Sequence, residues 1–212
     1  MKQNSITTII GHKGYGKTTL TNALMLLNSK PTIIADPRFQ YEKNDRRLTF
    51  KSVSKFRSWI TKSSNYRAFK HYKLELIVNA FDDTFEELAE IVSKMKDITF
   101  VVDEIDMFFD TRTSNKSFMY KLVHYGRHNE IDLITTSRRP ANISRNLTSQ
   151  TDIFYFSRLR EPHDKKYIKD AVGSEFVEVV ENLEKFEFLK IDDELNSSIV
   201  KTTQKDLDLL SA

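Results

Sequence analysis

One stretch constrains the fold of this chain more than any other: GHKGYGKTTL, from Gly11 to Leu20. It contains three of the molecule's five glycines. Glycine lets a backbone turn tightly and lets a ligand approach the main-chain amides, because no Cβ intervenes. The β-branched run SITTII precedes the stretch and predicts a strand, and apolar residues follow it at helical spacing. The sequence therefore predicts a strand, a glycine loop and a helix in direct succession.

The glycine loop matches the pattern G-x-x-x-x-G-K-[ST]. In such a loop, successive backbone N–H groups converge on phosphates, and the following helix adds the partial positive charge of its N-terminus. Lys17 is expected to contact the β- and γ-phosphates, and Thr18 to hold Mg²⁺ through its hydroxyl. ATP and Mg²⁺ are thus the expected cofactors. The predicted nucleotide-binding residues are Gly11, His12, Lys13, Gly14, Tyr15, Gly16, Lys17, Thr18 and Thr19.

A second motif follows an apolar stretch, ITFVVDEID, which predicts a buried strand ending at Asp103 and Glu104. An aspartate at the tip of such a strand can hold Mg²⁺ through its water shell. The adjacent glutamate can act as general base for a water molecule in line with the γ-phosphate. This pair of acids favours ATP hydrolysis over phosphoryl transfer to a small molecule. The alternative is that Glu104 only caps the following helix, and for Asp106 such a capping role is favoured.

Strand and helix patterns alternate along the chain. Strands are expected within residues 5–11, 31–37, 74–81, 97–104, 131–137, 151–158 and 185–192, the last being the final strand, and helices within 17–30, 82–95 and 117–128. Asp82 or Asp83 is the expected cap of the second helix. This order predicts an α/β fold with a mostly parallel central sheet sandwiched by helices. Residues 1–192 are expected to form a single P-loop ATPase domain, and residues 193–212 a polar C-terminal tail or short extension.

Basic residues are concentrated in the segment from Arg38 to Lys73, which we call the basic segment. It holds eleven Lys or Arg and two acids, a net charge of +9, whereas the whole chain carries +3. Aromatic residues alternate with these charges, a mixture typical of surfaces that contact nucleic-acid phosphates and bases. The equally supported alternative is a solvated helix face whose aromatics turn into the core. The candidate DNA contacts are Arg46, Arg47, Lys51 and Arg57.

Composition excludes some classes of function. The chain has no cysteine, which rules out disulfides, thiolate metal sites and a cysteine nucleophile. It also has no run of about eighteen apolar residues, the length expected of a membrane-spanning helix. We therefore expect no stable membrane insertion, and a location in the cytoplasm.

The stretch from Tyr125 to Asp164 resembles the FtsK/HerA superfamily of P-loop DNA translocases. In that family a glycine-arginine pair precedes a strand that ends in a TQRP-like turn, and another apolar strand follows. Here the pair lies in YGRH, and the turn reads TSRRP, from Thr136 to Pro140. The segment PTIIADPRFQY is also similar to the family's second strand. The resemblance implies a P-loop NTPase of the additional-strand, RecA-like type.

The resemblance also implies residue roles. The glutamine of the family's turn senses the γ-phosphate. Ser137, which has a shorter side chain, stands at that position, and Thr136 is the alternative sensor. The family forms homo-oligomeric rings, usually hexamers, in which an arginine from one subunit completes the neighbour's site. Arg127 is the first candidate for this arginine, and Arg138 and Arg139 are the alternatives.

Within the superfamily, the length of the chain is similar to that of the compact genome-packaging ATPases of tailless double-stranded DNA viruses. That likeness implies double-stranded DNA and a capsid vertex protein as partners, and the host cytoplasm or the virion as location. Three alternatives stay open: a phage assembly or export ATPase of the zonula-occludens-toxin type, a nucleotide kinase with Arg158 and Arg160 in its lid, and an assembly protein that binds ATP without hydrolysing it.

Overall fold

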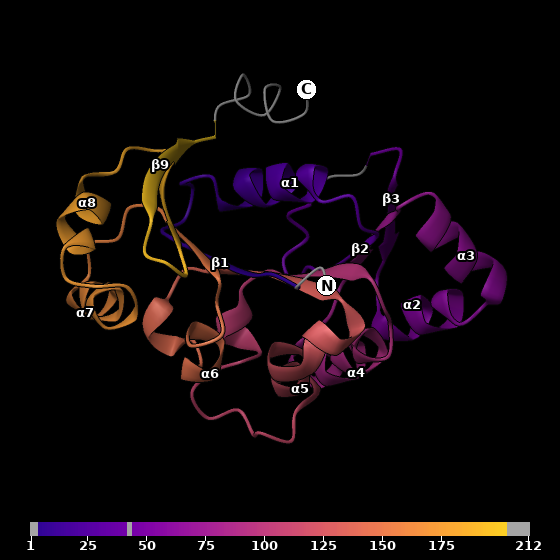
Figure 1. The fold of residues 1–212 in the computed structure, drawn as a ribbon. Helices are drawn as coiled ribbons and strands as arrows, with labels where there is room; N and C mark the ends of the chain where they lie inside the picture. Colours follow the sequence, from indigo (N-terminus) through magenta and orange to yellow (C-terminus); the bar gives the residue numbers. More distant parts are fainter. Residues whose placement is uncertain (1–3, 42–43, 203–212) are drawn as a thin grey trace.

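A nine-stranded sheet forms the centre of the computed structural model, which describes residues 4–41 and 44–202 (Figure 1). The strand order is β3-β4-β2-β5-β6-β1-β7-β8-β9. All pairs from β3 to β7 are parallel, and β8 and β9 are added antiparallel. The bounds are β1 Ile6–Ile10, β2 Thr32–Ala35, β3 Arg47–Phe50, β4 Glu75–Val78, β5 Ile98–Val102, β6 Ile131–Ser137, β7 Ile153–Phe156, β8 Glu187–Asp192 and β9 Ser197–Lys201. The predicted α/β class is confirmed.

The position of β6 decides the subtype of the fold. It lies between β1, which leads into the glycine loop, and β5, which leads into Asp103 and Glu104. A strand inserted between those two is the feature that defines the additional-strand type, so this prediction is confirmed as well. Because parallel strands point the same way, the glycine loop, the acidic pair and the TSRRP turn all leave the sheet at one edge, its carboxyl edge.

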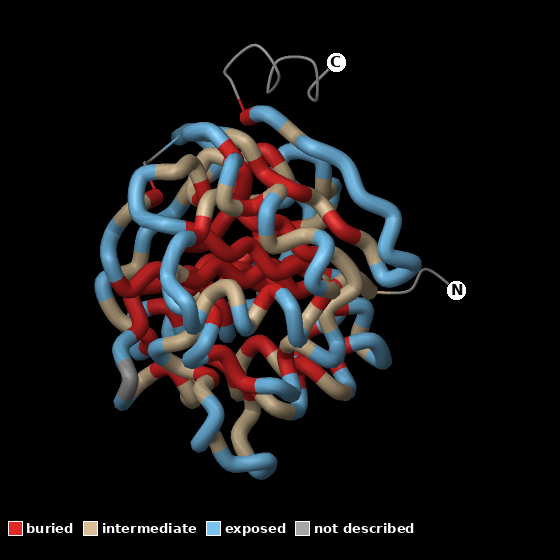
Figure 2. Tube along the Cα trace, turned by 90° about the vertical axis from the view of Figure 1, so that its left-hand side faces the viewer, coloured by how far each residue is buried: buried red, intermediate tan, exposed pale blue. Residues whose placement is uncertain are grey.

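Helices cover both faces of the sheet (Figure 1). Helix α1 lies on one face, where Leu20 and Met25 pack with Ile9 and Ile34 from the strands. Helices α4, α5 and α6 lie on the other face, α2 and α3 beside the β3 end of the sheet, and α7 and α8 near its β8 end. The inner strands, from β4 to β7 in the sheet order, are almost continuously buried, as the red core of Figure 2 shows, whereas the edge strands β3 and β9 are more exposed. The bounds are α1 Lys17–Leu27, α2 Val53–Ile60, α3 Ser63–His71, α4 Asp82–Ser93, α5 Phe118–Tyr125, α6 Arg145–Thr148, α7 Pro162–Ala171 and α8 Phe176–Asn182.

The structure contains elements that the sequence did not reveal. Within the basic segment lie β3, α2 and α3, and after β6 come the short helices α6, α7 and α8. The expectation that no strand follows Asp192 was wrong, because β9 pairs with β8 along its length. Four of the five residues of β9 are exposed at the sheet edge, so it lacks the apolar alternation from which strands are recognised.

The start of α4 also differs from the prediction. Its first helical residue is Asp82, and Phe81 occupies the cap position instead of Asp82 or Asp83. The Phe81 backbone N–H donates to Thr84 Oγ1 at 3.0 Å, so a side chain inside the first turn satisfies the helix start. Among the described residues, none of the helices has the length and apolarity that crossing a bilayer requires.

Candidate functional site

The glycine loop links β1 to α1 and presents its backbone to an open space. Gly14 and Gly16 have φ angles of 79° and 93°, a region that side chains with a Cβ rarely adopt. Gly11 is required for a different reason: a Cβ there would lie 1.6 Å from Ser157 Oγ at the end of β7. Helix α1 starts at Lys17 with no acidic residue in its first turn. Its partial positive charge and free N–H groups therefore point at whatever anion the loop holds.

Lys17 folds back over this loop. Its Nζ donates to the carbonyl of Gly11 at 2.7 Å and to that of His12 at 3.3 Å. The side chain is only 8% exposed, and its burial lowers the pKa to about 8 although Glu104 opposes the shift. An anion bound beside Nζ would stabilise the charged form. Lys17 is therefore a buried cation whose desolvation outweighs the opposing charge of Glu104.

Asp103 stands directly after β5 and is buried. Thr136 Oγ1, from β6, donates to Asp103 Oδ1 at 2.7 Å and accepts from the Glu104 backbone N–H at 3.1 Å. Gln40 Nε2 approaches Asp103 Oδ2 at 3.4 Å. Burial raises the pKa of Asp103 to about 6. Thr136 thus holds one oxygen of the Asp103 carboxylate and the backbone of Glu104. The other Asp103 oxygen, Oδ2, faces Gln40 in the loop after β2.

Glu104 turns its carboxylate toward the loop side of the sheet edge. Its backbone has φ 53°, the left-handed region, and its carboxylate makes no capping hydrogen bond to the short 3₁₀ helix Ile105–Met107. Arg138 Nε lies 2.5 Å from Glu104 Oε1 as an ion pair without hydrogen-bond alignment. Burial raises the pKa of Glu104, and the charges of Arg138 and Lys17 oppose that shift. The side chain does not cap a helix, so the capping alternative loses its support.

A cavity of about 390 Å³ brings these groups together. Its lining combines acidic and basic side chains, backbone of the glycine loop and one phenyl ring. The lining residues are Lys13, Gly14, Gly16, Lys17, Thr18, Thr19, Gln40, Asp103, Glu104, Arg138 and Phe186. Gly11, His12 and Tyr15 belong to the same loop but do not line the cavity. Among the described residues, no group of three His, Cys, Asp or Glu side chains is gathered as a metal site. This donor set fits a cation such as Mg²⁺, which commonly takes one or two protein ligands and completes its shell with phosphates and water.

The TSRRP turn is held by polar contacts of its own. Ser137 Oγ donates to Asp106 Oδ1 at 2.7 Å and accepts from the Arg139 backbone N–H at 3.0 Å. Ser137 is fully buried and does not line the cavity. Thr136 contacts the Asp103 carboxylate and the Glu104 backbone, whereas the Ser137 side chain contacts Asp106 and the turn, and the Ser137 carbonyl accepts from the Gly11 N–H at 3.1 Å. Of the two candidate sensors, Thr136 is the one that hydrogen-bonds to Asp103 and Glu104.

Arg127 lies at the opposite edge of the sheet, in the 3₁₀ helix Gly126–Asn129 that precedes β6. It is exposed and lines a separate cavity of about 270 Å³ with His124 and Asp152. The chain does not bring Arg127 to its own glycine loop. Any contact between Arg127 and such a loop must involve another copy of the chain.

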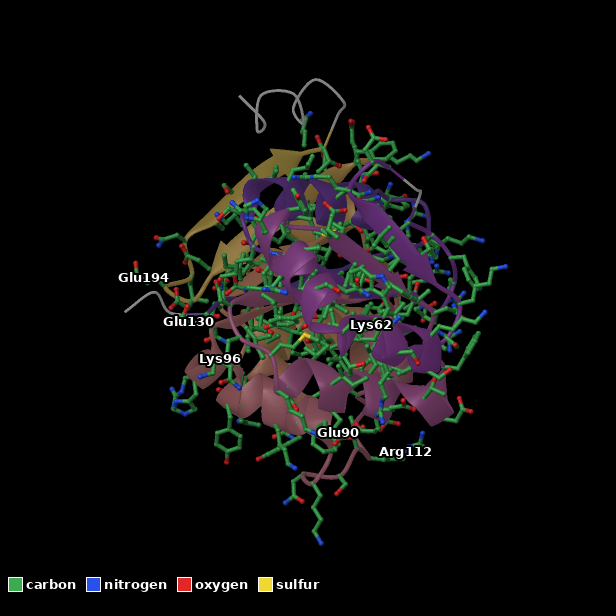
Figure 3. All side chains as sticks on the ribbon, turned by 90° about the vertical axis from the view of Figure 1, so that its right-hand side faces the viewer. Lys62, Glu90, Lys96, Arg112, Glu130 and Glu194 are labelled. Atoms are coloured by element: carbon green, nitrogen blue, oxygen red, sulfur yellow. The ribbon has the colours of Figure 1, made fainter. Side chains whose placement is uncertain are left out.

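The basic segment divides into two sets of side chains. Phe56 and Phe69 are fully buried, and Tyr41 nearly so. Most of its aromatics thus pack into the core, while Phe39 and Tyr72 remain exposed at 61% and 65%. This supports the core alternative for the aromatics. Four of the eleven basic residues lie on α2 and α3, on the side of the molecule that faces the viewer in Figure 3, where Lys62 between the two helices is labelled.

The four candidate DNA contacts have different surroundings. Arg47 is 9% exposed, pairs with the buried Glu75 and donates from its terminal nitrogen to Asn22 Oδ1 at 2.8 Å. The structure therefore gives Arg47 a role inside the fold, joining β3 to β4 and α1. Arg46 and Arg57 are about half exposed, with side chains 50% and 48% accessible, and Lys51 is exposed. Lys43, also part of the segment, lies outside the described residues.

Three residues that line the cavity were not predicted to do so from the sequence. Gln40 comes from the loop after β2, and Phe186 from the turn before β8, more than a hundred residues from the glycine loop. Gln40 lies in the segment PTIIADPRFQY, but nothing in that resemblance assigns it a role, and Phe186 belongs to no recognisable motif. Arg138 was considered as an arginine donated to a neighbour, and its contact is with Glu104 of its own chain. Only the fold could bring these three residues to the loop.

No protein-family model matches the chain, and no curated protein sequence matches it. Solved structures do. The genome packaging NTPase B204 from Sulfolobus turreted icosahedral virus 2, in complex with sulfate, is 21% identical with a TM-score of 0.77, covering 95% of this chain and 98% of that chain. The same protein in complex with ATP-gammaS gives 21% identity and a TM-score of 0.76, with the same coverage.

The N-terminal domain of zonular occludens toxin from Neisseria meningitidis is also similar. It is 16% identical with a TM-score of 0.52, covering 97% of this chain and 98% of that chain. At these identities the likeness establishes a shared fold. That fold is the α/β P-loop type that the resemblance implies.

Proposed function

We propose that this protein hydrolyses ATP and uses the energy to move double-stranded DNA, as a viral genome-packaging motor. One observation carries the proposal: the buried Lys17, Asp103 and Glu104 converge on a single cavity at the carboxyl edge of the sheet, beside a glycine loop. The structural neighbours named as genome packaging NTPases support it, one of them solved with ATP-gammaS.

The proposed chemistry follows from the lining residues. The loop amides and the ammonium of Lys17 hold the β- and γ-phosphates and neutralise charge that develops in the transition state. Thr18 and Asp103 would hold Mg²⁺, Asp103 through water, and the ion supplies further neutralisation of the phosphate oxygens when bound. Glu104 accepts the proton of the attacking water. Thr136 keeps Asp103 and the Glu104 backbone in register through its two hydrogen bonds.

Two arginines take separate roles in this proposal. Arg138 acts within its own subunit, where its charge 2.5 Å from Glu104 keeps that carboxylate ionised and oriented. Arg127 acts between subunits, because its exposed position at the far edge of the sheet can reach only another copy's cavity. A homo-oligomeric ring, with six subunits the expected number, places one edge against the other in this way.

The basic segment is the proposed DNA surface, through Arg46, Lys51 and Arg57. Charges of this kind contact phosphates regardless of sequence, which suits a motor that must travel along any DNA. A capsid vertex protein is the proposed docking partner, and the host cytoplasm or the virion the location. An assembly ATPase of the zonula-occludens-toxin type is the second candidate, favoured by the fold similarity to that toxin's N-terminal domain.

The testing experiment measures ATP turnover with and without double-stranded DNA, together with the mass of the particle in solution. The motor proposal expects a ring and a rate that rises with DNA. Turnover that rises with a nucleoside and not with DNA would identify a kinase instead. ATP binding without measurable hydrolysis in either condition would leave a nucleotide-dependent assembly protein.

A further inference from the structure

Phe186 is the one aromatic side chain among the residues that line the cavity. It precedes β8, whereas the charged lining residues Asp103, Glu104 and Arg138 follow β5 and β6. Asp103, Glu104 and Arg138 mark the end where a γ-phosphate and a cation belong. The remaining length of a bound nucleoside triphosphate must therefore extend away from these charged groups. The phenyl ring lines the same cavity and lies beside Gly16 of the glycine loop.

The ring is held against the loop. An ideal Cβ on Gly16 would lie 2.5 Å from Phe186 Cδ1 and 3.4 Å from Thr202 Oγ1. The bare backbone of Gly16 is thus what allows the aromatic ring to lie this close to the phosphate-binding amides. Phe186 is nevertheless 36% exposed, because its other surface faces the cavity. An apolar ring presented beside a phosphate-binding loop offers a flat surface to a ligand.

The backbone that carries the ring is unusual. Phe186 has φ 68°, a left-handed conformation that costs a bulky residue energy. It persists because the end of the β8–β9 hairpin closes on it: Thr202 N donates to the Phe186 carbonyl at 2.9 Å and Thr202 Oγ1 at 3.3 Å. Lys185 Nζ lies 5.2 Å from the ring centroid. Strained backbone of this kind is concentrated at ligand sites, where it aims a side chain.

We propose that Phe186 is the nucleobase platform of the site, a flat surface on which the base of a bound nucleoside triphosphate stacks. This inference rests on the proposed function and adds a second subsite to it. Stacking recognises the face that every base possesses, and removing a stacking aromatic weakens binding about 5- to 150-fold per base. Phosphate binding by the loop and base binding by Phe186 are then separable contributions to affinity.

The test uses this separability. ATP and inorganic tripolyphosphate share the phosphates, and only ATP has a base. In calorimetric titrations, Phe186→Ala should weaken ATP binding about 10-fold, within the range for lost stacking, and leave tripolyphosphate binding unchanged. Phe186→Tyr should bind ATP as the wild type does, because it keeps the ring. Tyr72→Ala, which removes an aromatic that is 65% exposed at the other end of the sheet, is the matched control and should change neither affinity.

A spectroscopic variant gives an independent readout. The chain has a single tryptophan, so Phe186→Trp in a Trp59→Phe background places the only indole on the platform. Its fluorescence should change when ATP is added and not when tripolyphosphate is added.

Several outcomes would overturn the inference. One is an equal loss of ATP and tripolyphosphate affinity in Phe186→Ala, which would mean that the ring only packs the loop. Full ATP affinity in Phe186→Ala, or in Phe186→Leu, would show that no aromatic face is needed. If the wild-type protein bound neither compound, the proposed function itself would fail, and the platform with it.

Discussion

The glycine-loop cavity and the basic segment differ in how well the sequence predicts where their side chains lie in the structure. In the cavity, residues that were singled out for their chemistry lie together: Lys17, Thr18, Asp103 and Glu104 share one space. In the basic segment, neighbours in sequence separate: Arg46 is half exposed, and Arg47 is buried against Glu75. Short motifs with a defined structural context, such as the glycine loop and the acidic pair after β5, predict where a site lies. Composition predicts only that charge is present.

The largest expected effect is that of Lys17→Ala. Removing the buried ammonium takes away the charge that pairs with the terminal phosphates, so ATP binding should weaken strongly and hydrolysis should fall below detection. Equilibrium binding of a labelled ATP analogue and a phosphate-release assay measure the two effects. Lys169→Ala, which removes an exposed lysine of α7 outside the cavity, is the control and should change neither binding nor rate. Undiminished turnover in Lys17→Ala would remove the glycine loop from the site.

Arg127→Ala should have an effect of similar size on rate and none on ATP binding. An arginine supplied between subunits contributes about 10³ to 10⁵ in rate where it has been assigned. Mixed particles distinguish this role from a structural one. When Arg127→Ala subunits are combined with Glu104→Gln subunits, some sites pair an intact Glu104 with an intact Arg127, so activity should partly return. A mixture that stays inactive, although mass measurements show mixed particles, would contradict the role and favour Arg139.

Arg47→Ala should lower the stability of the fold, in addition to any effect on DNA binding. Removal of one partner of a buried ion pair costs about 3–5 kcal/mol, because the other charge stays buried without compensation. Arg46 also approaches Glu75, at 3.5 Å, so we expect a loss of about 3 kcal/mol in the free energy of unfolding in urea. Arg46→Ala is the control, and it should cost at most about 1 kcal/mol because its side chain is half exposed. Equal losses of stability in both variants would contradict the distinction between a largely buried Arg47 and a half-exposed Arg46.

The smallest effects are expected from the exposed members of the basic segment. Lys51→Ala and Arg57→Ala should each weaken DNA binding alike for all sequences. Each should also reduce the slope of log affinity against log salt by about 1, the contribution of one phosphate contact. Lys169→Ala, on the exposed surface of α7, is the control of equal charge. A slope that stays unchanged in the folded variants would make the basic segment a solvated face and nothing more.

The success of prediction from the sequence also differs between the centre of the sheet and its exposed edges. The strands β1, β5 and β6 were predicted because each is a run of apolar or β-branched residues. Their parallel order brings the loop, the acids and the TSRRP turn to one edge of the sheet. The exposed β9 and the segment's β3 gave no such signal. Gln40 and Phe186 reach the cavity from distant loops, so no spacing in the sequence could reveal them. Nor could it separate Ser137, which holds Asp106, from Thr136, which holds both acids.

The central claim is that the converging side chains hydrolyse ATP, with Glu104 as the base. The most direct test is a single-turnover measurement on Glu104→Gln, beside the wild type and an Asp106→Asn control. Glu104→Gln should bind ATP as tightly as the wild type and hydrolyse it about 10²-fold more slowly or worse, the scale of a positioned general base. Asp106→Asn should hydrolyse ATP at close to the wild-type rate. A normal rate in Glu104→Gln would contradict the account.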